Sequence, residues 1–268
     1  MALLAELAER DATGEHKAIY AEIRRLGGVP MVALIFRHLA TLPGTLEWAW
    51  RAVAPSWQSG LVQEAAWDIA RGLTVAPLVP VPRAALDALG IDGATRAGID
   101  NVLAAYNRAN PENLLTVMCL LRLLGGCAAS VPLAGRDWQP PPAPVPLLPM
   151  ADVASFAPEV AALLDLMAAP GDDGEPKVVQ SLYRHFAHLP AFLALAVTLL
   201  VARRRDGAIA AAVAALQRAM SAAADELVRA MDAPPVPHTG ARPALTRFGG
   251  GVIAEMIVVG TLLERALP

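Results

Sequence analysis

The chain has 268 residues, of which 55% are hydrophobic and 18% are charged, and its mean hydropathy of +0.44 first suggests a membrane protein. The apolar runs argue against that class: residues 189–202 include Pro190 and fall short of the roughly 18 to 20 residues of a span, and residues 249–263 carry Glu255 in the middle. A net charge of −3 leaves no basic surface to neutralise a phosphate backbone, which excludes nucleic-acid binding.

Nearly every segment has helical periodicity, and the valine and isoleucine runs of a parallel sheet are missing, so the sequence predicts an all-α protein. Pro30 opens the second helix, because proline is tolerated in the first helical turn. Asn110 precedes Pro111 at the start of another helix, where asparagine is a preferred N-cap. The helices expected before the middle of the chain are 16–26, 30–42, 46–54, 57–73, 83–89, 94–107 and 111–124.

A proline-rich segment divides the chain. Residues 125–149 lose periodicity and include five prolines within residues 140–146, a run that cannot continue a helix. We therefore expect a first helical repeat over residues 1–127, a connector over 128–155 and a second helical repeat over 156–268. The helices expected after the connector are 158–167, 177–189, 191–203, 208–231 and 248–267.

An internal repeat supports this division. Residues 36–49 recur as residues 183–196, with Arg37 and His38 matching Arg184 and His185 at an offset of 147 residues. A weaker, collinear match relates residues 114–121 to 256–263. Two homologous helical halves in one chain would form an internal pseudo-dimer, packed about a pseudo-twofold axis as in a symmetric dimer. A pocket between the halves is the natural ligand site.

The cysteines and the N-terminus predict the compartment. Cys119 and Cys127 are too few for a disulfide framework or a zinc site, which favours a reducing environment. Residues 1–11 carry acids where a signal peptide needs basic residues. We expect a cytoplasmic protein, and a homodimer of the whole chain stays open.

Several segments together resemble one family. They are 20–24, 29–33, 39–44, 49–51 and 102–111, followed by the leucine pair at 114–115. Their order is similar to that in the group I 2-haloacid dehalogenases, the cofactor-free class that acts on both enantiomers. The resemblance is strongest over residues 14–125. It implies an all-helical pseudo-dimer with its site between the halves, no metal and no cofactor.

The resemblance also implies a mechanism, in which water attacks the C2 carbon directly and displaces halide without a covalent enzyme ester. An aspartate is the base, which typically contributes ~10²–10⁴-fold to a rate, and an asparagine helps to hold the water. The asparagine falls on Asn110. The tryptophan and phenylalanine that line the family's pocket correspond to Met31 and Leu34.

The family's base is missing from its expected position. Counting back from Pro190 along one unbroken helix, the family's serine-aspartate pair falls on Ser181 and Leu182. If Leu182 occupies the base position, Leu182→Asp should raise halide release. The upstream acids Asp172 and Asp173 would need a gap in the helix to take its place.

A histidine pair on the same helix leaves three interpretations open. Ser181, His185 and His188 lie at i, i+4 and i+7 and project from one face. His185 is structural, as its counterpart His38 suggests, or replaces the missing base, or binds a metal with His188, for which the sequence supplies no further ligand.

Two functions follow. The first is a dehalogenase-like hydrolase that binds a small 2-substituted carboxylic acid between the halves, with Arg37 or Arg184 as a possible carboxylate anchor; the alternative for these arginines is a solvent-facing surface. The second is a catalytically inactive descendant that acts as a small-molecule binding or interaction protein. We expect neither a nucleic acid nor a membrane as a partner.

Overall fold

A computed structural model describes residues 4–126, 131, 136–150, 155–168, 179–232 and 239–268. These residues form helices and loops and contain no strand, so the all-α prediction is confirmed. The α-helices are α1 (Gly14–Gly27), α2 (Leu34–Leu39), α3 (Thr45–Gln58), α4 (Leu61–Arg71), α5 (Arg83–Ala88), α6 (Gly93–Leu123), α7 (Pro158–Met167), α8 (Ser181–Phe186), α9 (Pro190–Arg205), α10 (Ala208–Leu227), α11 (Ala241–Arg247) and α12 (Ile253–Ala266). Short 3₁₀ turns cover η1 (Glu9–Asp11) and η3 (Val228–Ala230), and a π-helical turn, η4 (Phe248–Val252), joins α11 to α12.

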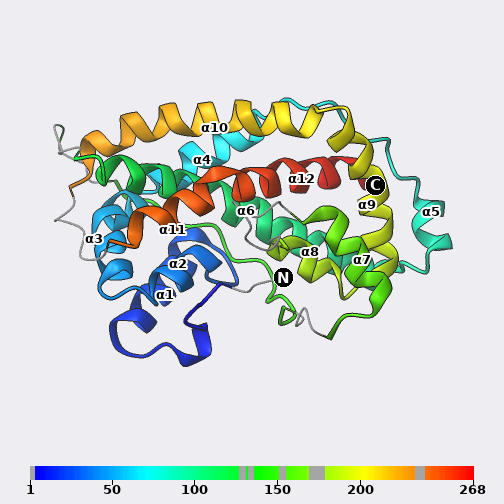
Figure 1. The fold of residues 1–268 in the computed structure, drawn as a ribbon, viewed down its shortest axis with the longest axis horizontal. Coiled ribbons are helices and arrows are strands. Elements are labelled where there is room, and N and C mark those ends of the chain that lie inside the picture. Colours follow the sequence, from blue (N-terminus) through cyan, green and yellow to red (C-terminus); the bar gives the residue numbers. More distant parts are fainter. Residues whose placement is uncertain (1–3, 127–130, 132–135, 151–154, 169–178, 233–238) are drawn as a thin grey trace.

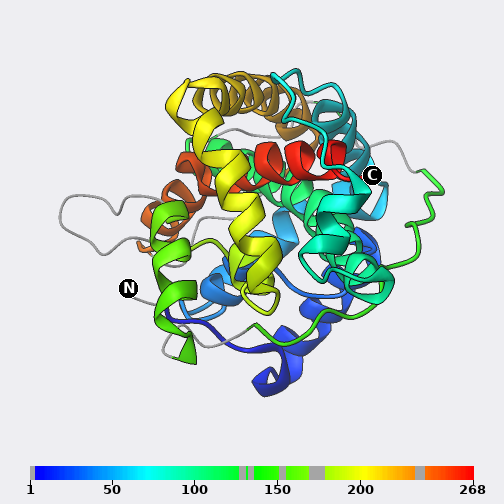
Figure 2. The same cartoon turned by 90° about the vertical axis from the view of Figure 1, so that its right-hand side faces the viewer.

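The long helices form the middle of the molecule. Helix α6 packs against α4, α10 and α12, and α10 also packs against α4 and α12. Helices α1 to α3 gather at one end of the long axis and α7 to α9 at the other (Figure 1). Figure 2, seen from the second end, shows α7 and α9 side by side. The short helices α2 and α8 therefore reach the central layer from opposite ends.

Helix α6 is the largest departure from the predicted elements. The sequence predicts two helices with Asn110 as an N-cap between them, but one helix of 31 residues runs through Pro111. A proline inside a helix costs about 3 kcal/mol or more. Residues 109–120 are all buried against neighbouring helices, and this packing offsets the cost. Asn110 is therefore an interior helical residue, and its prediction as a cap is wrong.

Other helix ends also differ from the predicted ones. Helix α2 begins at Leu34 rather than Pro30, and α8 begins at Ser181, because Ala33 and Gln180 have extended backbones with ψ of 149° and 142°. Helix α3 continues through Pro55 to Gln58. The positions of these helix ends depend on tertiary packing, and the periodicity of the sequence carries no information about that packing.

The two parts of the chain share several local features. Helices α2 and α8 have the same length, and Leu34 and Ser181, their first residues, are 147 positions apart. Gly60 and Gly207 have the same offset, adopt φ of 76° and 77°, and immediately precede α4 and α10. This left-handed backbone favours glycine. The contacts are exchanged, since α8 packs against α6 whereas α2 packs against α11.

The most apolar helical stretch is in the interior. Residues 241–266 are long and apolar enough to cross a membrane by length and composition, and 61% of the most apolar part is buried inside the protein. Core helices of soluble proteins meet the same criteria.

Candidate functional site

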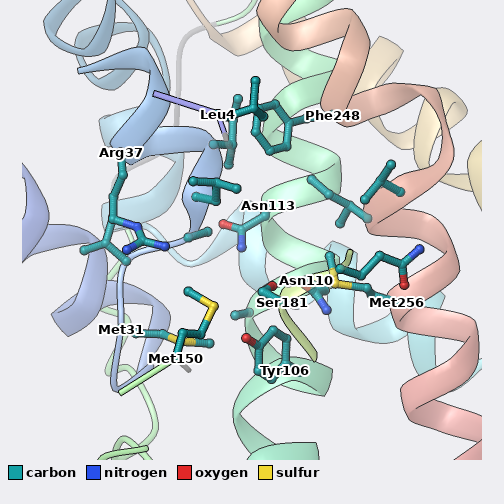
Figure 3. Close-up of a pocket in the computed structure, with 18 of the residues that line it drawn as sticks. Leu4, Met31, Arg37, Tyr106, Asn110, Asn113, Met150, Ser181, Phe248 and Met256 are labelled. Atoms are coloured by element: carbon teal, nitrogen blue, oxygen red, sulfur yellow. Dashed lines mark hydrogen bonds between the residues drawn. The ribbon is translucent and has the colours of Figure 1, made fainter. Parts of the chain in front are cut away.

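A small cavity lies where α2, α6, α8 and the α11–α12 segment meet. Its volume is about 80 Å³. A water needs roughly 10–15 Å³ of such space, so the cavity accommodates several water-sized groups, the scale of a small organic acid. Its lining is mostly apolar, and Leu4 and Met150 from two extended segments complete it. Figure 3 shows Leu4 and Phe248 at one end, with Tyr106 and Ser181 toward the other.

Four of the residues predicted from the sequence line this cavity together. They are Asn110 from α6, Ser181 from the start of α8, and Met31 and Leu34 from α2 and the loop before it. Residues from both ends of the molecule therefore meet at one place, as the family resemblance implies. The apolar replacements at positions 31 and 34 keep the pocket hydrophobic.

Leu182 does not line the cavity, so its predicted place there is wrong. Its side chain is fully buried in the hydrophobic core. The physical reason is the short helix: Ser181 is the first residue of α8 and faces the cavity, and the next residue lies about 100° further around the helix. The unbroken helix assumed upstream of position 181 ends at the extended Gln180.

No carboxylate lines the cavity among the described residues. Asp172 and Asp173 lie outside them. Three carboxylates contact lining residues from behind: Glu6 pairs with Arg37 at 3.2 Å, Glu9 accepts from the Val32 backbone N–H at 2.8 Å, and Glu255 accepts a hydrogen bond from Gln180 Nε2 at 2.9 Å. Glu255 also forms an ion pair with Arg204.

Three buried polar atoms of the lining have no hydrogen-bond partner in the described part of the chain. They are Asn110 Nδ2, Arg37 Nε and Gln180 Oε1. Asn110 is only 5% exposed, and the Arg37 side chain is 13% exposed. A buried donor without an acceptor costs about 1–3 kcal/mol. Two unmatched donors on residues that line one cavity indicate a ligand or water with acceptor oxygens.

Of the two matching arginines, Arg37 on α2 and Arg184 on α8, Arg37 lines the cavity. Its backbone is also bound, because Leu7 N–H donates to its carbonyl oxygen at 2.9 Å. Arg184, the counterpart on α8, is not part of the lining.

His185 lies behind the lining and contacts Tyr106, a pocket residue that the sequence analysis missed. The Tyr106 hydroxyl is 2.8 Å from His185 Nδ1, and the rings meet edge to face at 5.5 Å. Burial raises the pKa of Tyr106 well above its usual value, and burial lowers the pKa of His185. The signal was available: Tyr106 precedes Asn110 by four residues and shares its helix face.

Among the described residues, the structure brings no further metal ligand to His185 and His188. His188 Nε2 contacts the carbonyl oxygen of Pro149 at 2.9 Å. In the described part of the chain, no group of three or more histidine, cysteine, aspartate or glutamate residues is placed to hold a metal ion.

Comparison with known proteins begins with the sequence. No protein-family model matches the chain. It is 33% identical over 194 residues to a configuration-inverting 2-haloacid dehalogenase of Alcaligenes xylosoxydans xylosoxydans. The alignment covers 65% of this chain and 65% of the length of that curated relative.

Solved structures show that the chain is also similar in fold to known proteins. A D-2-haloacid dehalogenase mutant in complex with D-2-CPA has a TM-score of 0.74 and 18% identity, covering 99% of this chain and 97% of that chain. A D-2-haloacid dehalogenase with L-LA has a TM-score of 0.66 and 20% identity, covering 99% and 94%. At these identities the likeness shows the fold alone. The chain is therefore similar in sequence, over 194 residues, to a 2-haloacid dehalogenase, and similar in fold over nearly its whole length to D-2-haloacid dehalogenases.

Proposed function

We propose that this protein is a dehalogenase-like hydrolase that binds a small 2-halocarboxylic acid in the cavity and replaces the halide with water. The observation that carries the proposal is the buried Asn110 Nδ2, which has no partner among the described residues and belongs to the lining of a mostly apolar pocket. An amide in this position holds a water or a substrate oxygen, and the apolar walls suit the halogen and the alkyl group.

Arg37 is the proposed anchor of the substrate carboxylate. Its guanidinium lies beside the cavity with Nε unpartnered, while Glu6 takes one of its other nitrogens. An arginine-carboxylate pair has the charge-assisted hydrogen bonds that fix a small acid in one orientation. With the carboxylate held there, C2 lies toward the interior of the cavity, where Asn110 orients the attacking water.

Direct attack by water is favoured over an enzyme ester, because an ester route needs a nucleophilic carboxylate. None lines the cavity among the described residues. Displacement by water from behind the halogen inverts the configuration at C2. This mode of reaction matches the group I type of chemistry, with turnover of both enantiomers.

We also infer that the chain is an internal pseudo-dimer. The equal lengths and 147-residue offset of α2 and α8 support it, as do the matching glycines before α4 and α10. The exchanged contacts of α2 with α11 and α8 with α6 are those expected when equivalent elements pack across a pseudo-twofold axis. The catalytic asparagine and the serine of the pocket then come from different halves.

A second candidate is a binding protein without catalysis. It is favoured by the burial of Leu182 in the core, where the family's base was expected, and by the lack of a carboxylate in the described lining. Both candidates use the same ligand site. They differ in whether a bound acid reacts.

Halide release separates them. We expect release from D- and L-2-chloropropanoate, assayed separately, with lactate of inverted configuration as the product. A single turnover in H₂¹⁸O should place ¹⁸O in the lactate. Asn110→Leu should reduce release by roughly 10²-fold or more, because the water loses its hydrogen-bond partner. The matched control is Asn101→Leu on the same helix, whose amide bonds the Val145 carbonyl away from the cavity. Binding of propanoate without any halide release would favour the second candidate.

A further inference from the structure

The contact between Tyr106 and His185 joins α6 to α8 beside the cavity. Tyr106 and Asn110 lie one helical turn apart and both line it. Figure 3 shows Tyr106, Asn110 and Ser181 close together at the same end of the pocket. His185 is 5% exposed and lies directly behind the phenol.

The hydrogen bonds of His185 determine the direction of its bond to Tyr106. Its Nε2 lies 3.0 Å from the carbonyl oxygen of Leu148, closer than the 3.3 Å between Nδ1 and the carbonyl oxygen of Ser181, and since a carbonyl only accepts, we assign the hydrogen to Nε2. In the neutral ring, Nδ1 is then an acceptor. The Tyr106 hydroxyl, 2.8 Å away, therefore donates to Nδ1. Its oxygen accepts from the Ser181 hydroxyl, a hydrogen bond that acts to lower the pKa of Tyr106, and its second lone pair remains for a donor in the cavity.

The charged form of His185 also has partners. After Nδ1 gains a proton, it faces both the Tyr106 oxygen and the carbonyl oxygen of Ser181, which is 3.3 Å away. Nε2–H keeps its bond to Leu148. Besides burial, Arg184 on α8 and His188, just beyond the end of α8, lower the pKa of His185 by charge repulsion, and Arg37 from α2 acts to lower the pKa of Tyr106. Two carbonyl oxygens therefore offset the repulsion from these cations during turnover.

We propose that Tyr106 and His185 form the proton relay that accepts the proton of the attacking water; this proposal rests on the proposed hydrolysis. The water oxygen forms a bond to C2, and the C2–halogen bond breaks with its electron pair leaving as halide. The water proton passes to the Tyr106 oxygen while the Tyr106 proton passes to His185 Nδ1. The products are the 2-hydroxy acid, halide and imidazolium.

The imidazolium has a route to solvent. His185 and Leu148 line a second, more open pocket that shares no lining residue with the cavity. The proton gained in the reaction can leave through that pocket without crossing the substrate. Tyr106 is the catalytic residue of the pair, and His185 acts through it.

The repeat supplies an internal comparison. His38, the counterpart of His185, binds the carbonyl oxygen of Ala5 at 2.8 Å, and its aromatic neighbour is Phe248 at 6.1 Å. Phenylalanine has no hydroxyl, so no relay can form at that end. Each histidine contacts a backbone carbonyl of a segment outside the helices, Ala5 for His38 and Leu148 for His185. His185 contacts the phenol of Tyr106 as well.

The test uses 2-chloropropanoate for turnover and propanoate as the unreactive ligand. Tyr106→Phe and His185→Gln should each lower kcat by roughly 10²–10⁴-fold, the range of a general base, while propanoate affinity changes less than about threefold. Wild-type kcat should fall toward acidic pH with a single ionisation below the usual histidine pKa, and His185→Gln should lose this limb. His188→Gln is the matched control, because His188 also holds the extended segment but does not contact Tyr106.

The outcomes distinguish the relay from the proposed function. Near-normal kcat in a folded Tyr106→Phe protein overturns the relay, as does an acidic limb that survives in His185→Gln. Propanoate binding without wild-type halide release overturns the relay and leaves the ligand site standing. Absence of both binding and release overturns the proposed function as well. Thermal unfolding of each variant reports whether a loss of turnover is a loss of folding.

Discussion

Helices α2 and α8 carry the same Arg-His pair at equivalent positions but have different surroundings. His38 is half-buried and contacts Ala5 and Phe248, whereas His185 is 5% exposed and contacts Leu148 and Tyr106. The helices themselves are nearly alike. The chemical difference comes from the aromatic residue that another helix brings to each histidine, and from burial.

The first residues of the two helices differ in a corresponding way. Leu34 begins α2 and Ser181 begins α8, and both face the cavity. The first residue of α2 is therefore apolar, whereas the first residue of α8 brings a hydroxyl group to the pocket. Two helices of similar sequence can thus differ in chemistry through one pocket-facing residue and one contacting partner.

The largest effect is expected where a buried residue of α8 becomes charged. Leu182→Asp should destabilise the protein by more than about 3 kcal/mol, because a carboxylate in the core has no partner. It should not restore a base, contrary to the expectation from the sequence, since position 182 does not face the cavity. Ser181→Asp, one residue earlier, should cost far less. Chemical denaturation of both variants tests this, and equal losses would contradict the assigned orientation of α8.

A smaller effect on stability is expected from the buried carboxylic acid Glu112. Glu112 is 1% exposed, its Oε2 has no partner among the described residues, and burial raises its pKa well above the usual value, partly offset by Arg108. The folded state therefore keeps a proton that the unfolded state loses as pH rises above the ordinary glutamate pKa, so stability falls in that direction.

Glu112→Gln should remove this loss and raise the midpoint of unfolding at pH 8 relative to the wild type. The control is Glu264→Gln, whose partner Asn107 lies at the edge of an open pocket. Identical pH profiles for wild type and Glu112→Gln between pH 5 and 8 would contradict the assignment.

The smallest effect is expected from His185 in acid. Burial lowers its pKa, so below pH ~6.5 the unfolded state binds the proton first, and stability falls as pH decreases through the folded-state pKa. The slope for one proton is at most about 1.4 kcal/mol per pH unit. His185→Gln should flatten this decline and His188→Gln should not. Urea midpoints between pH 5 and 7 measure it.

Local patterns in the sequence suffice for the helical class and for most helices, whereas the pocket residues Met31, Leu34, Asn110 and Ser181 follow from the family resemblance, which the order of the motifs carries. Periodicity and motif order carry this information because they depend on neighbours along the chain. The missed contact between Tyr106 and His185 spans 79 residues, and no local spacing encodes it.

Tertiary packing decides the remaining features. Burial on all sides carries α6 through Pro111, where local rules end a helix. The extended Gln180 starts α8 at Ser181, and this one-residue choice turns Ser181 toward the cavity and Leu182 into the core. Successive residues of a helix point about 100° apart, so the site depends on where the helix begins, and the packing of both halves sets that point.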